Sequence, residues 1–171
     1  MISIIVATAL NGAIGLDNNL LYRQSADMKH FKELTTGNTV VMGRKTFESL
    51  PKGALPNRRN IVLTRNAELR LEGAECFQDI SQVLSHVSSQ EQVFIIGGEQ
   101  IYRQTIDIAD RIYLTLIQDT PSKADAYFPD ISPEIWQETE RTFYPADEKN
   151  PKDMYFITLQ KKRVTKKSRW T

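Results

Sequence analysis

The sequence predicts a single α/β domain with a central, mostly parallel, twisted sheet of about eight strands and flanking helices. Short β-rich runs alternate with amphipathic helical patterns along most of the chain. Two runs, VVMG and VFIIGG, are apolar without polar alternation, which is typical of central strands covered on both faces. The last two runs are joined by the turn-rich segment PADEKNPKD, so we expect them to form an antiparallel hairpin at a sheet edge.

The individual elements follow from these patterns. The expected strands cover residues 2–10, 38–43, 60–65, 74–77, 92–98, 111–117, 136–144 and 154–160. The expected helices cover residues 25–35, 45–50, 79–89 and 98–107. In the third of these, apolar residues recur at i, i+3, i+4 and i+7, which favours a helix with one buried face.

The composition fits one globular domain. The chain has 171 residues, of which 40% are hydrophobic and 25% charged. We expect the domain to cover residues 1–163, followed by a basic tail at 164–171. The single Cys76 cannot form an internal disulfide, which favours a reducing compartment and hence the cytoplasm.

The distribution of charge argues against a nucleic-acid partner. Six of the 22 basic residues lie in the last eleven positions, and the other 160 residues carry a net charge of −5. A nucleic-acid surface normally shows a broad basic face. We therefore expect no nucleic-acid partner and interpret the tail as a solvated chain end, with a weak anion or RNA contact as the alternative. Since no apolar run reaches the length of a membrane span, we expect no membrane association either.

Chemistry is expected where the strands of such a sheet end, because ligands bind beyond the carboxyl ends of parallel strands. After the first strand comes a long segment containing Gly12 and Gly15, which suggests a mobile lid, although an ordinary surface loop is equally compatible with it. A second exit places Arg44 and Lys45 directly after Gly43 at the start of a short helix, as in an anion site. This is not a Walker A loop, so we interpret it as a site for a dinucleotide phosphate.

Two further exits extend this interpretation. Gly97 and Gly98 lie between an apolar strand and a helix, where bare backbone N–H groups can approach a phosphate, although a glycine pair alone is a weak signal. Thr64 and Arg65 follow another strand. Arginines near such an exit suit a 2′-phosphate and therefore favour NADP over NAD, although each cation taken singly is more typical of a solvated surface.

Asp27 is the unusual residue of the first helix. At about 100° per residue, it falls on the same side as Met28, Phe31 and Leu34. An ionisable acid on an apolar stripe is costly to bury without a partner or a function. The structural alternative is a first-turn carboxylate that the helix dipole favours, with Ser25 as a candidate N-cap.

Collected together, these motifs show that the chain resembles the bacterial dihydrofolate reductases. The similarity runs from Met1 to about Arg163. It is carried by MISIIVA, NGAIG, the Ala26-Asp27-x-x-x-Phe31 spacing, VVMGRKTFESL, LPNRRNIVLT, FIIGGEQIY, IYLT and DAYFPD. The resemblance implies NADPH-dependent reduction of 7,8-dihydrofolate, with hydride passing to C6 of the pterin and a proton to N5. It also implies antifolate binding and a monomer, and it calls for no metal ion.

The resemblance assigns substrate roles to matched positions. Asp27 would hold the amidine edge of the pterin through charge-assisted hydrogen bonds, Thr115 would fix that carboxylate, and Arg58 would pair with the glutamate tail. Tyr22 stands where proton delivery would be assisted. The substrate-binding set is Ile5, Ala7, Asp27, Met28, Phe31, Lys32, Leu50, Leu55, Arg58, Ile96 and Thr115.

The resemblance likewise assigns a cofactor site. Asp125 would steady the lid, and a cis peptide bond is expected between Gly97 and Gly98. The cofactor-binding set is Ala7, Ala13, Ile14, Gly15, Asn18, Asn19, Leu20, Gly43, Arg44, Lys45, Thr46, Leu63, Thr64, Arg65, Gln78, Ile96, Gly97, Gly98, Glu99, Gln100, Ile101, Tyr102 and Asp125.

The chain departs from the family pattern just before Asp27. Many relatives have a Leu-Pro-Trp and a second proline here, whereas this chain reads Leu20-Leu21-Tyr22-Arg23-Gln24-Ser25. Without these prolines the segment should be less constrained. A water between residue 22 and Asp27 is expected to sit differently, because a tyrosine hydroxyl points differently from an indole N–H.

Two other functions are compatible with parts of the pattern. One is an NADPH reductase of the same fold acting on another heterocycle, such as a pyrimidine of riboflavin synthesis. The other is a sensing module that binds NADPH without turnover and engages a partner through its basic tail. Asp27 and Arg58 together favour the dihydrofolate reductase, because they complement a pterin with a glutamate tail.

Overall fold

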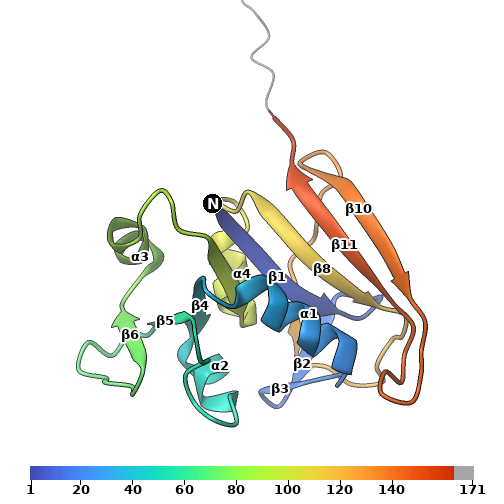
Figure 1. Ribbon diagram of the computed structural model, residues 1–171, viewed down its shortest axis with the longest axis horizontal. Helices are drawn as coiled ribbons and strands as arrows, with labels where there is room; N and C mark the ends of the chain where they lie inside the picture. Colours follow the sequence, from blue (N-terminus) through green and yellow to red (C-terminus); the bar gives the residue numbers. More distant parts are fainter. Residues whose placement is uncertain (164–171) are drawn as a thin grey trace, which may run out of the picture.

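The structure, a computed structural model, describes residues 1–163, so the expected basic tail lies outside the described residues (Figure 1). The main sheet has the strand order β10-β11-β8-β1-β7-β4-β5-β6. Its strands are β1 (Ile2–Thr8), β4 (Thr39–Gly43), β5 (Arg59–Leu63), β6 (Ala74–Phe77), β7 (Val93–Gly97), β8 (Arg111–Ile117), β10 (Trp136–Tyr144) and β11 (Met154–Lys161). Pairs from β8 to β6 are parallel, whereas β11 is antiparallel to both β8 and β10. The predicted sheet and its edge hairpin are confirmed.

Four helices occur within residues 1–163: α1 (Ser25–Thr35), α2 (Arg44–Ser49), α3 (Ile80–His86) and α4 (Glu99–Thr105). Helix α1 has the predicted bounds. Helix α3 ends before the predicted residue 89, because Val87 adopts an extended backbone with φ −108° and ψ 143°. None of these helices is long and apolar enough to cross a membrane.

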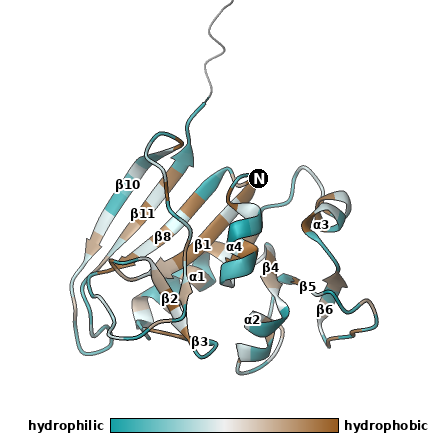
Figure 2. Cartoon of the chain, turned by 180° about the vertical axis from the view of Figure 1, so that it is seen from behind, coloured by the Kyte–Doolittle hydropathy of each residue, from teal (hydrophilic) through white to brown (hydrophobic). Residues whose placement is uncertain are grey.

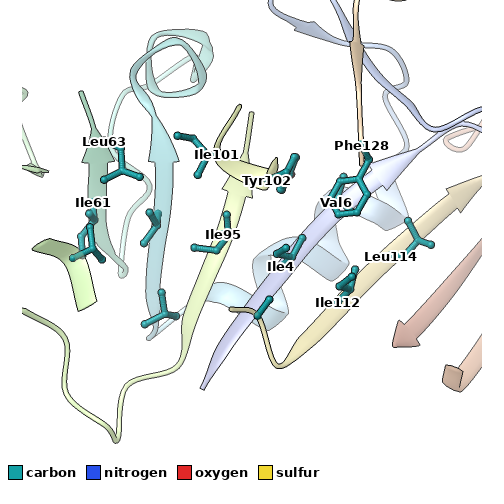
Figure 3. Close-up of a cluster of buried hydrophobic side chains, with 14 of the residues drawn as sticks. Ile4, Val6, Ile61, Leu63, Ile95, Ile101, Tyr102, Ile112, Leu114 and Phe128 are labelled. Carbon is teal, nitrogen blue, oxygen red and sulfur yellow. The ribbon is translucent and has the colours of Figure 1, made fainter. Parts of the chain in front are cut away.

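The helices cover both faces of the sheet, with α1 and α2 on one side (Figure 1) and α4 on the other (Figure 2). Because side chains alternate along a strand, neighbouring residues of β1 enter different clusters. Ile4 and Val6 belong to the cluster that includes residues of α3 and α4, shown in Figure 3, whereas Ile5 joins the cluster containing Phe47 of α2. Strands β4 and β7 are buried along almost their whole length, which confirms the prediction that they lie in the centre of the sheet.

The expected lid contains a small second sheet, which the sequence analysis did not predict. Strands β2 (Ala13–Leu16) and β3 (Asn19–Leu20) form a hairpin, and β9 (Ala126–Tyr127) pairs with β2. Asp17 and Asn18 form the turn with φ values of 49° and 63°, the left-handed conformation that a tight hairpin favours. Strands of two to four residues are too short to give a recognisable alternation pattern.

Candidate active site

A large cleft of about 1010 Å³ opens where β1, β4, β5 and β7 end. It is lined by every residue of the predicted cofactor set except Ala13, which begins β2 and is only 1% exposed. The sequence analysis missed further lining residues, which are Val6, Leu16, Ser49, Asn66, Gln104 and Ala126. Most of these are sequence neighbours of predicted positions, so extending each strand exit by a residue would have found Val6, Leu16, Asn66 and Ala126.

Two glycines allow the strand exits to pass close to one another. Gly97 has a φ of 121°, and a Cβ there would lie 3.3 Å from the hydroxyl oxygen of Tyr102. A Cβ on Gly43 would lie 3.2 Å from Cγ1 of Ile101. Gly97 therefore favours a residue without a side chain, and a side chain at Gly43 would require Ile101 to shift. The expected cis peptide bond between Gly97 and Gly98 is present.

Basic side chains gather at the ends of β4 and β5. Arg44 and Lys45 are exposed at the start of α2, and Arg65 is exposed just after β5. Arg44 Nε lies 3.5 Å from Glu48 Oε1, an exposed pair that contributes little stability. These cations are therefore available to an anion in the cleft, and the neighbouring Thr64 adds a hydroxyl to its lining.

Hydrogen bonds attach the lid to Asp125 and to the start of α2. The Oδ2 atom of Asp125 accepts a hydrogen bond of 3.0 Å from the backbone N–H of Asp17, and the N–H of Asp125 donates to the carbonyl of Gly15 at 3.0 Å. Asn18 Nδ2 donates to the carbonyl of Lys45 at 3.1 Å. The predicted contact of Asp125 with the lid is therefore present, and the lid also reaches the start of α2.

Within residues 1–163, the carboxylate of Asp27 has one hydrogen-bond partner, the hydroxyl of Thr115. Thr115 Oγ1 donates to Asp27 Oδ1 at 2.6 Å, and Thr115 is only 3% exposed. Thr115 on β8 lies opposite Ala7 of β1 in the sheet register. Since Ala7 lines the large cleft, Asp27 is linked through Thr115 to the strand next to that cleft.

Burial raises the pKa of Asp27, because a poorly solvated carboxylate is less stable than the neutral acid. The hydrogen bond from Thr115 and the nearby His30 act in the opposite direction and lower that pKa. Burial in turn lowers the pKa of His30, whose ring stacks on Phe156 with a centroid distance of 4.4 Å. The result is an acid whose protonation is set by a balance of burial and contacts, as acid–base chemistry near neutral pH requires.

Tyr22 bonds directly to a carboxylate other than Asp27. Its hydroxyl donates to Asp119 Oδ2 at 2.7 Å. Burial and the adjacent Asp119 carboxylate raise the pKa of Tyr22 to about 12, so the phenol stays protonated and its one proton is used in this bond. The expected role of Tyr22 in proton delivery stays a prediction, because the phenol oxygen can still accept a hydrogen bond from a water molecule.

About half of the predicted substrate wall lies in or against one apolar cluster, and two of its members are exposed on α1. Ile5, Phe31, Leu50, Leu55 and Ile96 belong to or pack against one apolar cluster on the side of α1 and α2. Met28, in contrast, is 58% exposed, and Lys32 is also exposed on α1.

Arg58 lies at the rim of this wall. Its Nη1 donates to Thr35 Oγ1 at 3.1 Å and its Nε to the carbonyl of Pro56 at 2.9 Å, whereas Nη2 has no hydrogen bond to any described residue. Partial burial lowers the pKa of Arg58, but a guanidinium stays charged at neutral pH. Arg58 therefore presents an oriented positive charge.

The start of α1 differs from the alternative in which Ser25 caps the helix. Gln24 occupies the N-cap position, and its side chain bonds to Lys152 rather than to its own helix. The backbone N–H of Ala26 instead donates a hydrogen bond to Asn150 Oδ1 at 2.8 Å. The cap comes from residues more than 120 positions away, so the local sequence gave no signal for it.

Comparison with known proteins identifies similar chains. A family model described as "Dihydrofolate reductase" matches residues 1–161. Dihydrofolate reductase type 3 of Salmonella typhimurium is 44% identical over 95% of this chain and 99% of its own, and dihydrofolate reductase of Bacillus subtilis is 38% identical over 97% and 98%. A solved dihydrofolate reductase from Enterococcus faecalis, complexed with NADP(H) and RAB-propyl, superposes with a TM-score of 0.88 at 33% identity, covering 95% of this chain and 97% of that one.

Proposed function

The chain belongs to the dihydrofolate reductase family, and we propose that it reduces 7,8-dihydrofolate to 5,6,7,8-tetrahydrofolate with NADPH. Hydride passes from the nicotinamide to C6 of the pterin, and a proton reaches N5. The observation that carries this proposal is the Asp27 carboxylate, held by Thr115 one strand away from the cleft residue Ala7.

Asp27 binds and orients the pterin. Its Oδ1 is engaged by Thr115, so Oδ2 and the second lone pair of Oδ1 can accept N–H bonds from the amidine edge. Such charge-assisted bonds are stronger than neutral ones. The raised pKa of Asp27 favours a proton shared between the pterin and the carboxylate, and this supports protonation at N5 next to the hydride acceptor C6.

The apolar residues beside Asp27 receive the rings. Ile5, Phe31, Leu50, Leu55 and Ile96 supply one apolar cluster, and the exposed Met28 becomes covered when a ligand is present. Burying such apolar surface favours binding by roughly 25 cal/mol per Å². Arg58 offers Nη2 to the α-carboxylate of the glutamate, with Lys32 nearby on α1.

NADPH occupies the large cleft. Ala7 and the lid receive the nicotinamide end, and the exits of β4, β5 and β7 receive the phosphates and adenosine. Arg44 and Arg65 bind the 2′-phosphate, because two guanidinium groups match its charge and geometry. The contact of Asp125 with Asp17 steadies the lid over this site.

The cellular setting follows from the same proposal. A monomer is sufficient, since Asp27, Thr115, Arg58 and the cleft residues all come from one chain. A free Cys76 suits the reducing cytoplasm. Antifolates are expected to compete for the site of the pterin.

The direct test follows NADPH absorbance in the presence of dihydrofolate. We expect turnover by the wild-type protein and a steep loss in Asp27→Asn at pH 7, because an amide keeps the shape of the side chain but cannot accept the same charge-assisted bonds. The dissociation constant for NADPH should be nearly unchanged. Rates close to wild type in Asp27→Asn would remove Asp27 from the mechanism, and no turnover by the wild-type chain would reject the proposed reaction.

A further inference from the structure

Gln24 is a buried polar side chain directly ahead of the helix that carries Asp27. Only 2% of Gln24 is exposed. Its Nε2 donates to the carbonyl of Lys152 at 2.7 Å, and its Oε1 accepts from the N–H of Lys152 at 3.0 Å. A buried amide destabilises the fold unless both its donor and its acceptor are satisfied. Both polar groups of the Gln24 amide are satisfied by the backbone of Lys152, in the way that paired strands satisfy each other's backbone groups.

The loop that receives Gln24, residues 145–153 between β10 and β11, also receives the start of α1. The N–H of Ser25 donates to the carbonyl of Lys149 at 3.3 Å, and the N–H of Ala26 donates to Asn150 Oδ1 at 2.8 Å. Asn150 is itself 3% exposed and is held by Asp147, whose Oδ1 accepts from Asn150 Nδ2 at 2.9 Å. The first N–H groups of a helix lack partners within the helix, and here the loop supplies them.

Through these contacts, the β10–β11 hairpin positions both Asp27 and its hydrogen-bond partner Thr115. Asp27 follows Ala26 in the first turn of α1, so the rotation and height of that turn set the position of the carboxylate. Thr115, which donates to Asp27, pairs in the sheet with Phe156 of β11. Strand β11 continues directly from the loop that holds Gln24. The 2.6 Å bond between Thr115 and Asp27 therefore connects two elements that the β10–β11 hairpin positions.

The same loop also holds the end of the lid. Lys152 Nζ lies 3.5 Å from Asp119 Oδ1, and Asp119 Oδ2 accepts from the Tyr22 hydroxyl. Residues 20–25 contain no proline, so their backbone lacks the restriction of φ that proline imposes. Hydrogen bonds to the β10–β11 loop supply the constraint in its place.

We infer that Gln24 is a positioning residue for the reaction: by pairing with the backbone of Lys152, it fixes the first turn of α1 and thereby the geometry of Asp27 and Thr115. This inference rests on the proposed function. It predicts that loss of the pairing lowers kcat/KM for dihydrofolate and leaves the affinity for NADPH, which binds in a separate cleft, unaffected.

Gln24→Met tests the inference, because methionine has nearly the same length and shape but makes neither hydrogen bond. The matched control is Thr39→Val. Thr39 is also buried, at 3% exposed, and donates to Glu91 Oε2 at 2.7 Å, but it lies at the amino-terminal end of β4, away from the cleft. Asn150→Ala is a second probe, since it removes the acceptor for Ala26 without altering Gln24.

The measurements are kcat and KM for dihydrofolate, the dissociation constant for NADPH by fluorescence, and the urea midpoint of unfolding. We expect Gln24→Met to lower kcat/KM for dihydrofolate by roughly ten- to a hundredfold, the scale set by small misplacements of reacting groups. NADPH affinity should stay within about twofold of wild type, since the cofactor site does not share these contacts. Thr39→Val should lower the urea midpoint without this kinetic change. Asn150→Ala, like Gln24→Met, should lower kcat/KM for dihydrofolate.

Three results would overturn the inference: an unchanged kcat/KM in Gln24→Met, equal kinetic losses in Gln24→Met and Thr39→Val, or equal losses of NADPH and dihydrofolate binding. If Gln24→Met does not fold, Asn150→Ala decides in the same way, with wild-type kinetics rejecting the role of the loop. Each comparison is a ratio to the wild-type protein. Absence of turnover in the wild type would therefore contradict the proposed function and is distinguishable from failure of this inference.

Discussion

Thr115→Val isolates the contribution of one hydrogen bond to the site. Valine has nearly the same shape as threonine, so the substitution removes the donor to Asp27 Oδ1 with little change in packing on β8. A hydrogen bond to a charged group is worth about 1.5 to 3 kcal/mol. Since about 1.4 kcal/mol corresponds to a factor of ten, we expect kcat/KM for dihydrofolate to fall by roughly ten- to a hundredfold.

The same substitution should alter the pH dependence of stability. Burial raises the pKa of Asp27, and the bond from Thr115 lowers it. Removing that bond raises the pKa further, by about one unit for each 1.4 kcal/mol lost. A carboxyl whose pKa is higher in the folded than in the unfolded state binds more protons when folded, so stability decreases as pH rises between the two pKa values. In Thr115→Val this decrease extends to higher pH.

Urea unfolding at a series of pH values measures this effect. The difference in unfolding free energy between wild type and Thr115→Val should be about 1 kcal/mol at low pH, where Asp27 is neutral, and should increase towards about 2 to 3 kcal/mol near neutral pH. Thr39→Val is the control, because it removes a similar bond to a carboxylate at the amino-terminal end of β4, away from the cleft. A pH-independent difference, or equal losses of kcat/KM in the two variants, would refute the coupling between Thr115 and Asp27.

Three other substitutions test separate parts of the site. Arg58→Ala should raise the KM for dihydrofolate by roughly ten- to a hundredfold, the usual loss for one partner of a close ion pair, and change it little for a pterin without glutamate; equal effects on both substrates would exclude a contact with the tail. Replacing Arg44 and Arg65 by Gln should narrow the preference for NADPH over NADH by about tenfold per lost phosphate contact, and an unchanged ratio would reject that assignment. Tyr22→Phe should keep turnover within about threefold of wild type, because the Tyr22 hydroxyl bonds to Asp119. A loss of turnover as large as that of Asp27→Asn would instead show that Tyr22 takes part in proton delivery.

The sequence predicts the features of this fold that depend on local pattern. Strands β4 and β7 are buried on both faces, and their uninterrupted apolar runs predict this directly. Helix α1 was predicted with its correct bounds, because apolar side chains recur at helical spacing. The resemblance then added the pairing of Asp27 with Thr115, residues 88 positions apart that no periodicity could connect.

Features that depend on distant contacts were not predictable in this way. Arg58 and Arg59 are adjacent, yet Arg58 lies at the rim of the apolar wall, whereas Arg59 bonds to Glu75 and Glu91 near the other edge of the sheet. Which of two neighbouring arginines faces a ligand depends on where the strand begins and on partners elsewhere in the chain. The burial of Gln24 could not be predicted from the local sequence either, since its partner Lys152 lies in a loop 128 residues away.

The orientation of Tyr22 changes the expected route of the proton. A phenol whose pKa is raised to about 12 does not ionise near neutral pH, and its single proton is already donated to Asp119. Asp27, in contrast, has a pKa raised by burial and an oxygen free of the Thr115 bond. We therefore predict that the proton reaches N5 from solvent beside Asp27, and the kinetics of Tyr22→Phe test this prediction. In this arrangement Tyr22 anchors the end of the lid to Asp119, and the segment before α1 contributes to catalysis through the position it gives Asp27.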